Sequence, residues 1–224
     1  MFPRVVIYSI KMIVKRCEET AELVGLSFGD GSLISRPKSN CLRFQLRGHL
    51  TEDKEHYDSH IIPLFNKEIM LPIFSRGVSV VKQKDFYGIS LESSKVREIF
   101  EYLGIPVGVK EELFIPQWIK ENERYFNGFL RGFFDTDGCV YCEKNYAMKN
   151  RKFHNQIRIR LTSVSENFLL SKGIKNIIQK HKSFTGKDGF IRQDSYNVKI
   201  SGSLQVNKWF DLIGSKNPKH LTKY

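Results

Sequence analysis

Two aspartates occupy the same position in a short segment that this sequence contains twice. The first copy, residues 23–31, reads LVGLSFGDG, and the second, residues 130–138, reads LRGFFDTDG. In register, Asp30 of the first copy corresponds to Asp137 of the second. A single Asp-Gly pair is more typical of a plain turn. Two copies carrying carboxylate oxygens, which Mg²⁺ prefers as ligands, instead predict a divalent metal site.

The residues around each aspartate predict two helices that pack closely together. Small residues recur four apart in each copy, namely Ala21, Gly25 and Gly29 in the first and Gly128, Gly132 and Thr136 in the second. Residues at this spacing form one face of a helix, and a face without side-chain bulk lets another helix approach. Glycine inside a helix costs about 0.5 to 1 kcal/mol relative to alanine, so close packing is the expected compensation.

The predicted helix ends strengthen the case for a bound cation. Gly31 and Gly138 follow the two aspartates, and we expect each helix to end there in a left-handed glycine. A carboxylate at a helix C-terminus faces the negative end of the helix dipole. Two such ends side by side would repel each other, and divalent cations would relieve that repulsion.

The repeat extends well beyond the two motifs and predicts the fold. After its motif, each half contains an alternating strand, a run with helical spacing, a second strand and a short amphipathic stretch. These segments are 42–47, 51–69, 87–91 and a stretch ending at Leu103 in the first half, and 156–162, 165–181, 196–201 and a stretch ending at Ile213 in the second. The predicted fold class is therefore α+β, with two αββαββα modules.

Glycine and proline punctuate the chain between the two halves, from Gly104 to Pro116. Such residues mark loops and turns, so this stretch predicts the boundary between the modules. We expect a first module at residues 1–108, a linker at 109–120 and a second module at 121–224.

The composition points to a folded protein with an acidic partner. The 224 residues include 36 Lys plus Arg against 24 Asp plus Glu, a formal charge of +12, and 41% of the residues are hydrophobic. That apolar share excludes a disordered chain. The excess charge favours a polyanion such as nucleic acid, with a solvated basic surface as the alternative.

The cysteines and the N-terminal run bear on cellular location. Four cysteines are too few for a disulfide framework, which indicates a reducing, intracellular compartment. Cys139 and Cys142 form a C-x-x-C pair, which we interpret as two strand cysteines without a metal. The six histidines show no metal-ligand spacing and are interpreted as structural or surface groups. The apolar run 2–13 is broken by Arg4 and Lys11, so we expect no membrane span or secretion signal.

With both motifs in order, the sequence resembles the LAGLIDADG homing endonucleases over residues 20–216. The second motif keeps the pattern L-x-G-x-x-D-x-D-G, whereas the first has Phe28 where the family often has an acid. The resemblance implies that catalytic divalent ions, Mg²⁺ with Mn²⁺ able to substitute, are bound by Asp30 and Asp137 with the backbone carbonyls of Gly29 and Thr136. It also implies two antiparallel sheets that form a saddle for double-stranded DNA.

The alternating strands carry residues suited to that role. Arg and Gln make bidentate contacts with guanine and adenine, and a β-ribbon fits the major groove. The expected DNA-binding residues are Arg43, Gln45 and Arg47 in the first half, Gln156, Arg158, Arg160 and Thr162 in the second, and Arg36, Lys38, Lys82, Lys84, Asn197 and Lys199 as an extension of the same surface. Lys199 is also the expected basic group near a scissile phosphate.

The implied reaction is Mg²⁺-assisted hydrolysis of one phosphodiester on each strand, which leaves a staggered double-strand cut, as in intron homing. Two alternatives remain, an RNA maturase on the same fold and a DNA-binding regulator without catalysis. Retention of both aspartates argues against each alternative. Because both motifs lie on one chain, a monomer that prefers an asymmetric target is expected.

Overall fold

The first half of the chain forms a four-stranded antiparallel sheet that follows directly from a helix. The computed structural model describes residues 13–35, 41–110, 113–145, 154–163, 190–193 and 196–224. Helix α2 (Glu18–Gly29) runs into the sheet, whose strand order is β1-β2-β4-β3. The strands are β1 (Gly31–Ser35), β2 (Leu42–His49), β3 (Ser79–Lys82) and β4 (Phe86–Ser93), and helix α6 (Lys95–Leu103) follows.

The second half repeats this arrangement. Helix α8 (Glu123–Asp137) runs directly into β5 (Gly138–Asn145), and the strand order is β5-β6-β8-β7. The remaining elements are β6 (His154–Thr162), β7 (Phe190–Gln193), β8 (Asn197–Ser201), α11 (Ser203–Leu212) and α12 (Pro218–Leu221). The identical strand order confirms the predicted pseudo-symmetric α+β fold. The helix predicted at 165–181 lies outside the described residues.

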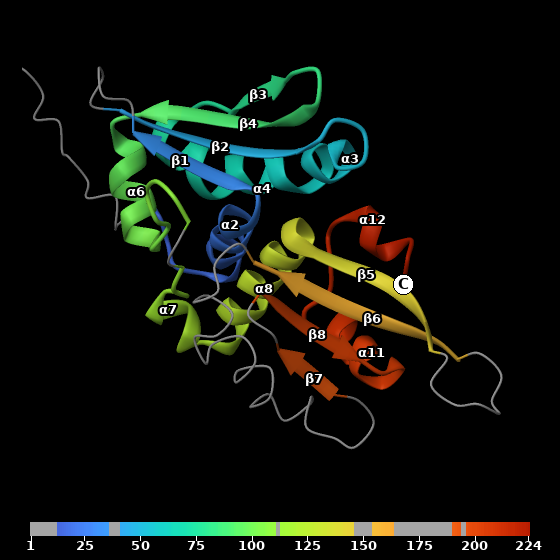
Figure 1. Ribbon diagram of the computed structural model, residues 1–224. Coiled ribbons are helices and arrows are strands. Elements are labelled where there is room, and N and C mark those ends of the chain that lie inside the picture. Colours follow the sequence, from blue (N-terminus) through green and yellow to red (C-terminus); the bar gives the residue numbers. More distant parts are fainter. Residues whose placement is uncertain (1–12, 36–40, 111–112, 146–153, 164–189, 194–195) are drawn as a thin grey trace, which may run out of the picture.

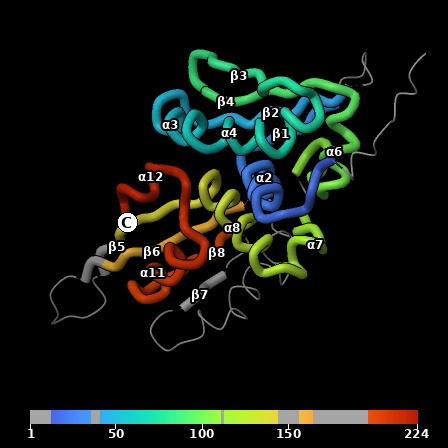
Figure 2. The backbone as a smooth tube through the Cα atoms, turned by 180° about the vertical axis from the view of Figure 1, so that it is seen from behind, coloured from blue at the N-terminus to red at the C-terminus, as the bar shows by residue number. Residues whose placement is uncertain are grey.

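Helices α2 and α8 lie side by side at the centre of the molecule, between the two sheets (Figures 1 and 2). Within the pair, Ala21, Phe129 and Phe133 are fully buried. Helix α7 (Gln117–Lys120) precedes α8 and falls within the range predicted as the linker. The motif helices therefore join the two halves, and each sheet begins at the C-terminus of one motif helix.

A mixed helical segment covers one face of the first sheet. It consists of α3 (Lys54–His56), π-helical η1 (Tyr57–Ile61), α4 (Ile62–Phe65), π-helical η2 (Asn66–Met70) and α5 (Leu71–Phe74). Each π-helical stretch ends two residues before a proline, Pro63 or Pro72, which has no N–H for the regular helical hydrogen bond. Helical structure thus extends beyond the predicted range 51–69. Phe65 packs on Phe44 of β2, with ring centroids 5.6 Å apart.

The expectation of left-handed glycines at the motif ends is wrong. Gly31 begins β1, and Gly138 has extended backbone with φ −93°. Glycine is required there by space, because a Cβ on Gly31 would lie 2.5 Å from the carbonyl oxygen of Ser27 and a Cβ on Gly138 would overlap Phe134. Left-handed glycines end the amphipathic helices instead, at Gly104 (φ 84°) and near the end of α11 at Gly214 (φ 73°).

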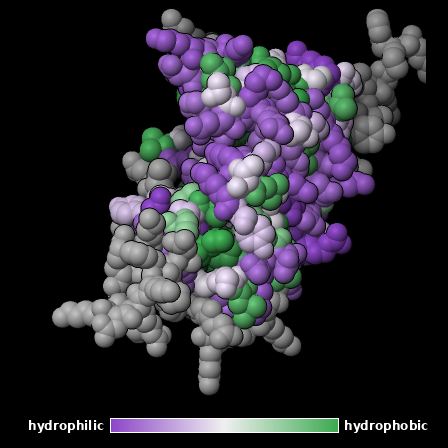
Figure 3. All heavy atoms as spheres, turned by 90° about the vertical axis from the view of Figure 1, so that its right-hand side faces the viewer, coloured by the Kyte–Doolittle hydropathy of each residue, from purple (hydrophilic) through white to green (hydrophobic). Residues whose placement is uncertain are grey.

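The surface seen in Figure 3 is mainly hydrophilic over the described residues, with apolar side chains scattered among polar ones. In the described part of the chain, no helix combines the length and the apolar character needed to cross a bilayer.

Candidate functional site

The backbones of α2 and α8 touch through their glycines. A Cβ on Gly25 would overlap the carbonyl oxygen of Phe129, and a Cβ on Gly132 would overlap that of Glu22. A Cβ on Gly128 would likewise overlap the first turn of α2. The predicted small-residue face is therefore confirmed as the contact between the two helices.

This contact brings the two motif aspartates to one end of the helix pair. Asp30 caps the C-terminus of α2, and Asp137 is the last residue of α8. The carboxyl carbon of Asp137 lies 3.4 Å from the point where a Cβ on Gly29 would stand. The Asp137 carboxylate thus lies beside the carbonyl end of α2.

Both carboxylates lie in an environment that disfavours their ionised form. Burial, with added repulsion from Asp137 and Asp53, raises the pKa of Asp30 to about 7. Burial raises the pKa of Asp137 to about 6, although nearby Lys110 and Lys219 oppose this rise. Among the described residues, neither carboxylate accepts a hydrogen bond. A cation between them would relieve this strain.

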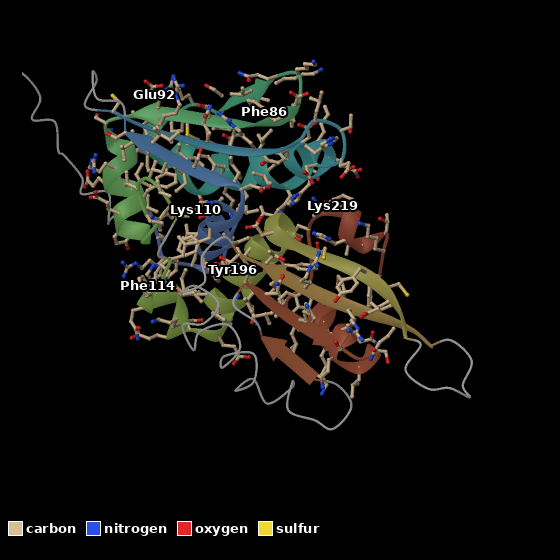
Figure 4. All side chains as sticks on the ribbon, in the orientation of Figure 1. Phe86, Glu92, Lys110, Phe114, Tyr196 and Lys219 are labelled. Carbon is tan, nitrogen blue, oxygen red and sulfur yellow. The ribbon has the colours of Figure 1, made fainter. Side chains whose placement is uncertain are left out.

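Two lysines that the sequence did not indicate lie near the aspartates. The ammonium of Lys110 donates to the carbonyl oxygens of Phe28, at 2.9 Å, and of Gly29. Burial lowers the pKa of Lys110, and the two aspartates oppose that shift. Lys219 donates to Asp53 at 2.6 Å. Figure 4 shows Lys110 and Lys219 on either side of the α2–α8 pair. The only signal in the sequence was the repeated Gly-x-Lys at residues 108–110 and 214–216.

These groups fit a hard divalent cation. Carboxylate and carbonyl oxygens are the donors that Mg²⁺ prefers, and Asp30, Asp137 and the Gly29 carbonyl supply them. The Lys110 ammonium already lies at the Gly29 carbonyl, which shows that this oxygen attracts a cation. The hydroxyl of Thr136 is used within its own helix, where it donates to Gly132 and Phe133. The predicted ligand is its carbonyl.

The two motifs differ two residues before their aspartates, where the first has Phe28 and the second has Asp135. Phe28 is buried in the first motif and packs edge-on against Phe129. The equivalent Asp135 is also buried, but its carboxylate accepts hydrogen bonds from the Ser215 hydroxyl at 2.5 Å and the Lys216 amide at 2.8 Å. The acid thus ties the C-terminal segment to α8. Asp135 is not among the predicted metal ligands.

A buried ionic cluster, which the sequence did not indicate, links α2 to α8 away from the two aspartates. Arg131 donates to Glu22 at 2.7 and 2.9 Å and to Glu18 at 2.9 Å, and His60 contacts Glu22 at 2.5 Å. Burial alone would raise the pKa of Glu22, but the hydrogen bond from His60 and the charge of Arg131 lower it. These partners lie far apart in sequence and have no motif spacing, so no local pattern indicates them.

The predicted reading residues of the first sheet share one face. In the strand register, Arg43, Gln45 and Arg47 alternate with core residues such as Phe44, which is fully buried. Arg43 is bound to Glu92 of β4 at 2.8 Å, and Arg47 lies over the Phe86 ring. Glu92 points away from the helices that cover this sheet (Figure 4). In the described part of the chain, no helix covers this polar face.

The second sheet brings a matching set together. Gln156, Arg158, Arg160 and Thr162 alternate with buried Ile159 and Leu161, and Lys199 and Asn197 pair with Arg160 and Thr162 in register. The same face contains Glu143 and Tyr141 of β5, which the sequence interpretation missed. Arg158 pairs with Glu143 at 2.5 Å, and Arg160 lies over the Tyr141 ring.

Other predicted residues fall elsewhere or outside the described chain. Lys82 pairs in register with Tyr87, whose side chain is on the helix-covered side, so Lys82 lies on the face opposite Arg47. Its place on the reading surface is therefore not supported. Lys84 lies exposed in the turn between β3 and β4. Arg36 and Lys38 lie outside the described residues, and the catalytic role of Lys199 stays a prediction.

Comparison with known proteins agrees with this arrangement. A family model described as a LAGLIDADG-like domain matches residues 125–214. An uncharacterised protein of Methanocaldococcus jannaschii is 24% identical over 200 residues, which cover 84% of this chain and 68% of the relative.

Solved structures share the fold at low sequence identity. I-DmoI in complex with DNA and Mn has a TM-score of 0.57 at 17% identity and covers 89% of this chain and 98% of I-DmoI. The LAGLIDADG meganuclease I-AabMI, bound to uncleaved DNA, has a TM-score of 0.55 at 12% identity and covers 91% of this chain and 87% of its own. This chain therefore contains a LAGLIDADG-like domain at residues 125–214 and has, over both halves, the fold of the LAGLIDADG homing endonucleases.

Proposed function

We propose that this chain is a site-specific DNA endonuclease that makes a staggered double-strand cut in a long asymmetric target. The observation that carries the proposal is the pair of carboxylates, Asp30 and Asp137, at the end of two helices in backbone contact. Each of these helices leads into a sheet with an arginine-bearing polar face. The similar I-DmoI was solved with DNA and Mn, and a variant of it with target DNA and Mg.

In this proposal, Asp30, Asp137 and the Gly29 carbonyl hold divalent ions, Mg²⁺ or Mn²⁺, and the Thr136 carbonyl is a further ligand. When bound, such an ion supplies positive charge that stabilises the transition state of phosphodiester hydrolysis. Lys110 and Lys219 add positive charge beside the carboxylates, which favours approach of the DNA phosphates. The arginine-bearing sheet faces position the duplex so that one phosphodiester of each strand lies at the helix ends.

Cleavage of a DNA library tests this function. Wild-type protein should cut a defined subset of sequences in the presence of Mg²⁺ and none in EDTA. Asp30→Asn and Asp137→Asn should abolish double-strand cutting while DNA binding stays largely intact, because only a carboxylate charge is removed. Cutting of both strands by each variant would exclude the metal site. Binding or splicing of RNA in place of DNA cleavage would favour a maturase.

We also propose that the protein acts as a monomer, because one chain supplies both aspartates. Light scattering should give the mass of one chain in the free protein and one chain per duplex in the complex. A dimer that is required for cleavage would contradict this proposal.

A further inference from the structure

One arginine occupies the same place in both sheets. Strand β2 pairs with β1 so that Arg43 lies opposite Ile34, the third residue after the motif glycine Gly31. Strand β6 pairs with β5 so that Arg158 lies opposite Tyr141, the third residue after the motif glycine Gly138. The two arginines are therefore equivalent under the pseudo-symmetry that relates the two aspartates.

The neighbouring positions do not share this identity. Two residues further along each strand, Gln45 lies opposite Ser32, whereas its equivalent Arg160 lies opposite Cys139. The next positions are Arg47 in the first sheet and Thr162 in the second. On the described central strands of the two sheets, Arg43 and Arg158 are thus the equivalent reading residues that are identical.

Each of these arginines is held by an acid on an adjacent strand. Nε and Nη2 of Arg43 both contact Oε2 of Glu92 at 2.8 Å, which leaves the Nη1 side of the guanidinium for another acceptor. Arg158 contacts Glu143 at 2.5 Å through Nη1 and Gln156 at 3.0 Å through Nη2. Arg158 is the less exposed of the two, at 18% against 32%. Such contacts fix each planar guanidinium on the polar face before DNA arrives.

We propose that Arg43 and Arg158 read guanines at symmetry-related positions in the two halves of the target. A guanidinium matches the O6 and N7 acceptors that guanine presents in the major groove. Equivalent positions in two symmetric modules meet equivalent base pairs on opposite strands. The target therefore contains a symmetric pair of guanines within a sequence that is otherwise asymmetric. This inference rests on the proposed function, because it requires that the sheets bind duplex DNA.

Selection of bound sequences from a randomised duplex library tests the inference without requiring cleavage. The wild type should select guanine at two positions equally distant from the centre, one on each strand. Arg43→Ala should lower the preference for guanine about 5- to 150-fold at one of them, and Arg158→Ala should do the same at the other. Arg158→Gln, which preserves more of the partly buried side chain, provides a second variant, and thermal melting confirms that each protein is folded.

Gln45→Ala and Arg160→Ala are the matched controls, because these residues are equivalent in place but different in chemistry. Each should relax the preference about two base pairs nearer to the centre, since two residues along a strand span about 7 Å. The base for which the preference is lost should differ between the two halves.

Three results would overturn the proposal: guanine positions at unequal distances from the centre, loss of a base other than guanine, or a uniform loss of affinity across all sequences. A protein that selects the symmetric guanines but never cleaves DNA would refute the nuclease and leave this inference intact. A protein that cleaves DNA but does not select the symmetric guanines would refute this inference and leave the nuclease proposal intact.

Discussion

Replacing Asp30 by asparagine should stabilise the folded protein while it removes cleavage. The pKa of Asp30 rises from 3.8 to about 7 through burial and through repulsion from Asp137 and Asp53. At pH 8 the folded state must hold this group ionised, at a cost of about 1.4 kcal/mol for each of about three pKa units. The ceiling is therefore about 4 kcal/mol. Water at the partly exposed carboxylate lowers the expected gain to about 1 to 3 kcal/mol.

The sign of the pH dependence makes this prediction specific. Between pH 3.8 and 7 the folded state binds more protons at Asp30 than the unfolded state, so wild-type stability is lost as pH rises through this range. Urea denaturation should show a large gain for Asp30→Asn at pH 8 and almost none at pH 4. The exposed Asp85→Asn is the matched control and should show no such trend. Mg²⁺ should raise the melting temperature of the wild type more than that of Asp30→Asn.

An equal gain at both pH values, or a loss of stability at pH 8, would refute the reasoning. Either result would mean that Asp30 is not under electrostatic strain. Loss of cleavage without the gain in stability would leave the catalytic role of Asp30 intact but remove the argument that a cation relieves repulsion there.

Three further predictions concern packing, protonation and the basic groups. Gly132→Ala should lower the free energy of unfolding by about 1 to 3 kcal/mol in urea, because the new methyl group would overlap the backbone of α2, whereas Gly77→Ala, with 3.7 Å to its nearest neighbour, should be tolerated. Burial, together with the charge of His60, lowers the pKa of His56 to about 3, so only the unfolded state protonates as pH falls below about 6.5, and acidification destabilises the fold. Between pH 7 and 5, His56→Gln should therefore gain about 2 kcal/mol relative to the wild type; a constant difference would contradict this. Finally, Lys110→Met should reduce the cleavage rate at saturating DNA more than Lys199→Met does, and the reverse order would favour Lys199 as the basic group at the cut.

The parts of this structure that sequence predicts are those with a local or repeated pattern. The paired helices follow from small residues four apart, and the polar faces of β2 and β6 follow from strict alternation. The pairing register is not visible in one strand, so the sequence alone does not show which face of the sheet Lys82 occupies. The roles of Arg131 and Lys110 depend on contacts with residues about 80 to 110 positions away, so no local pattern reveals them.

Backbone contact between α2 and α8 separates two tasks of the molecule. Because Gly25 and Gly132 leave no room for adjustment, the helix pair fixes the distance between the two carboxylates. The sheets begin at the ends of these helices and do not set that distance. Under the proposed function, residues such as Gln45 and Arg160 can therefore change and alter the recognised sequence, while the distance between the two cuts stays the same.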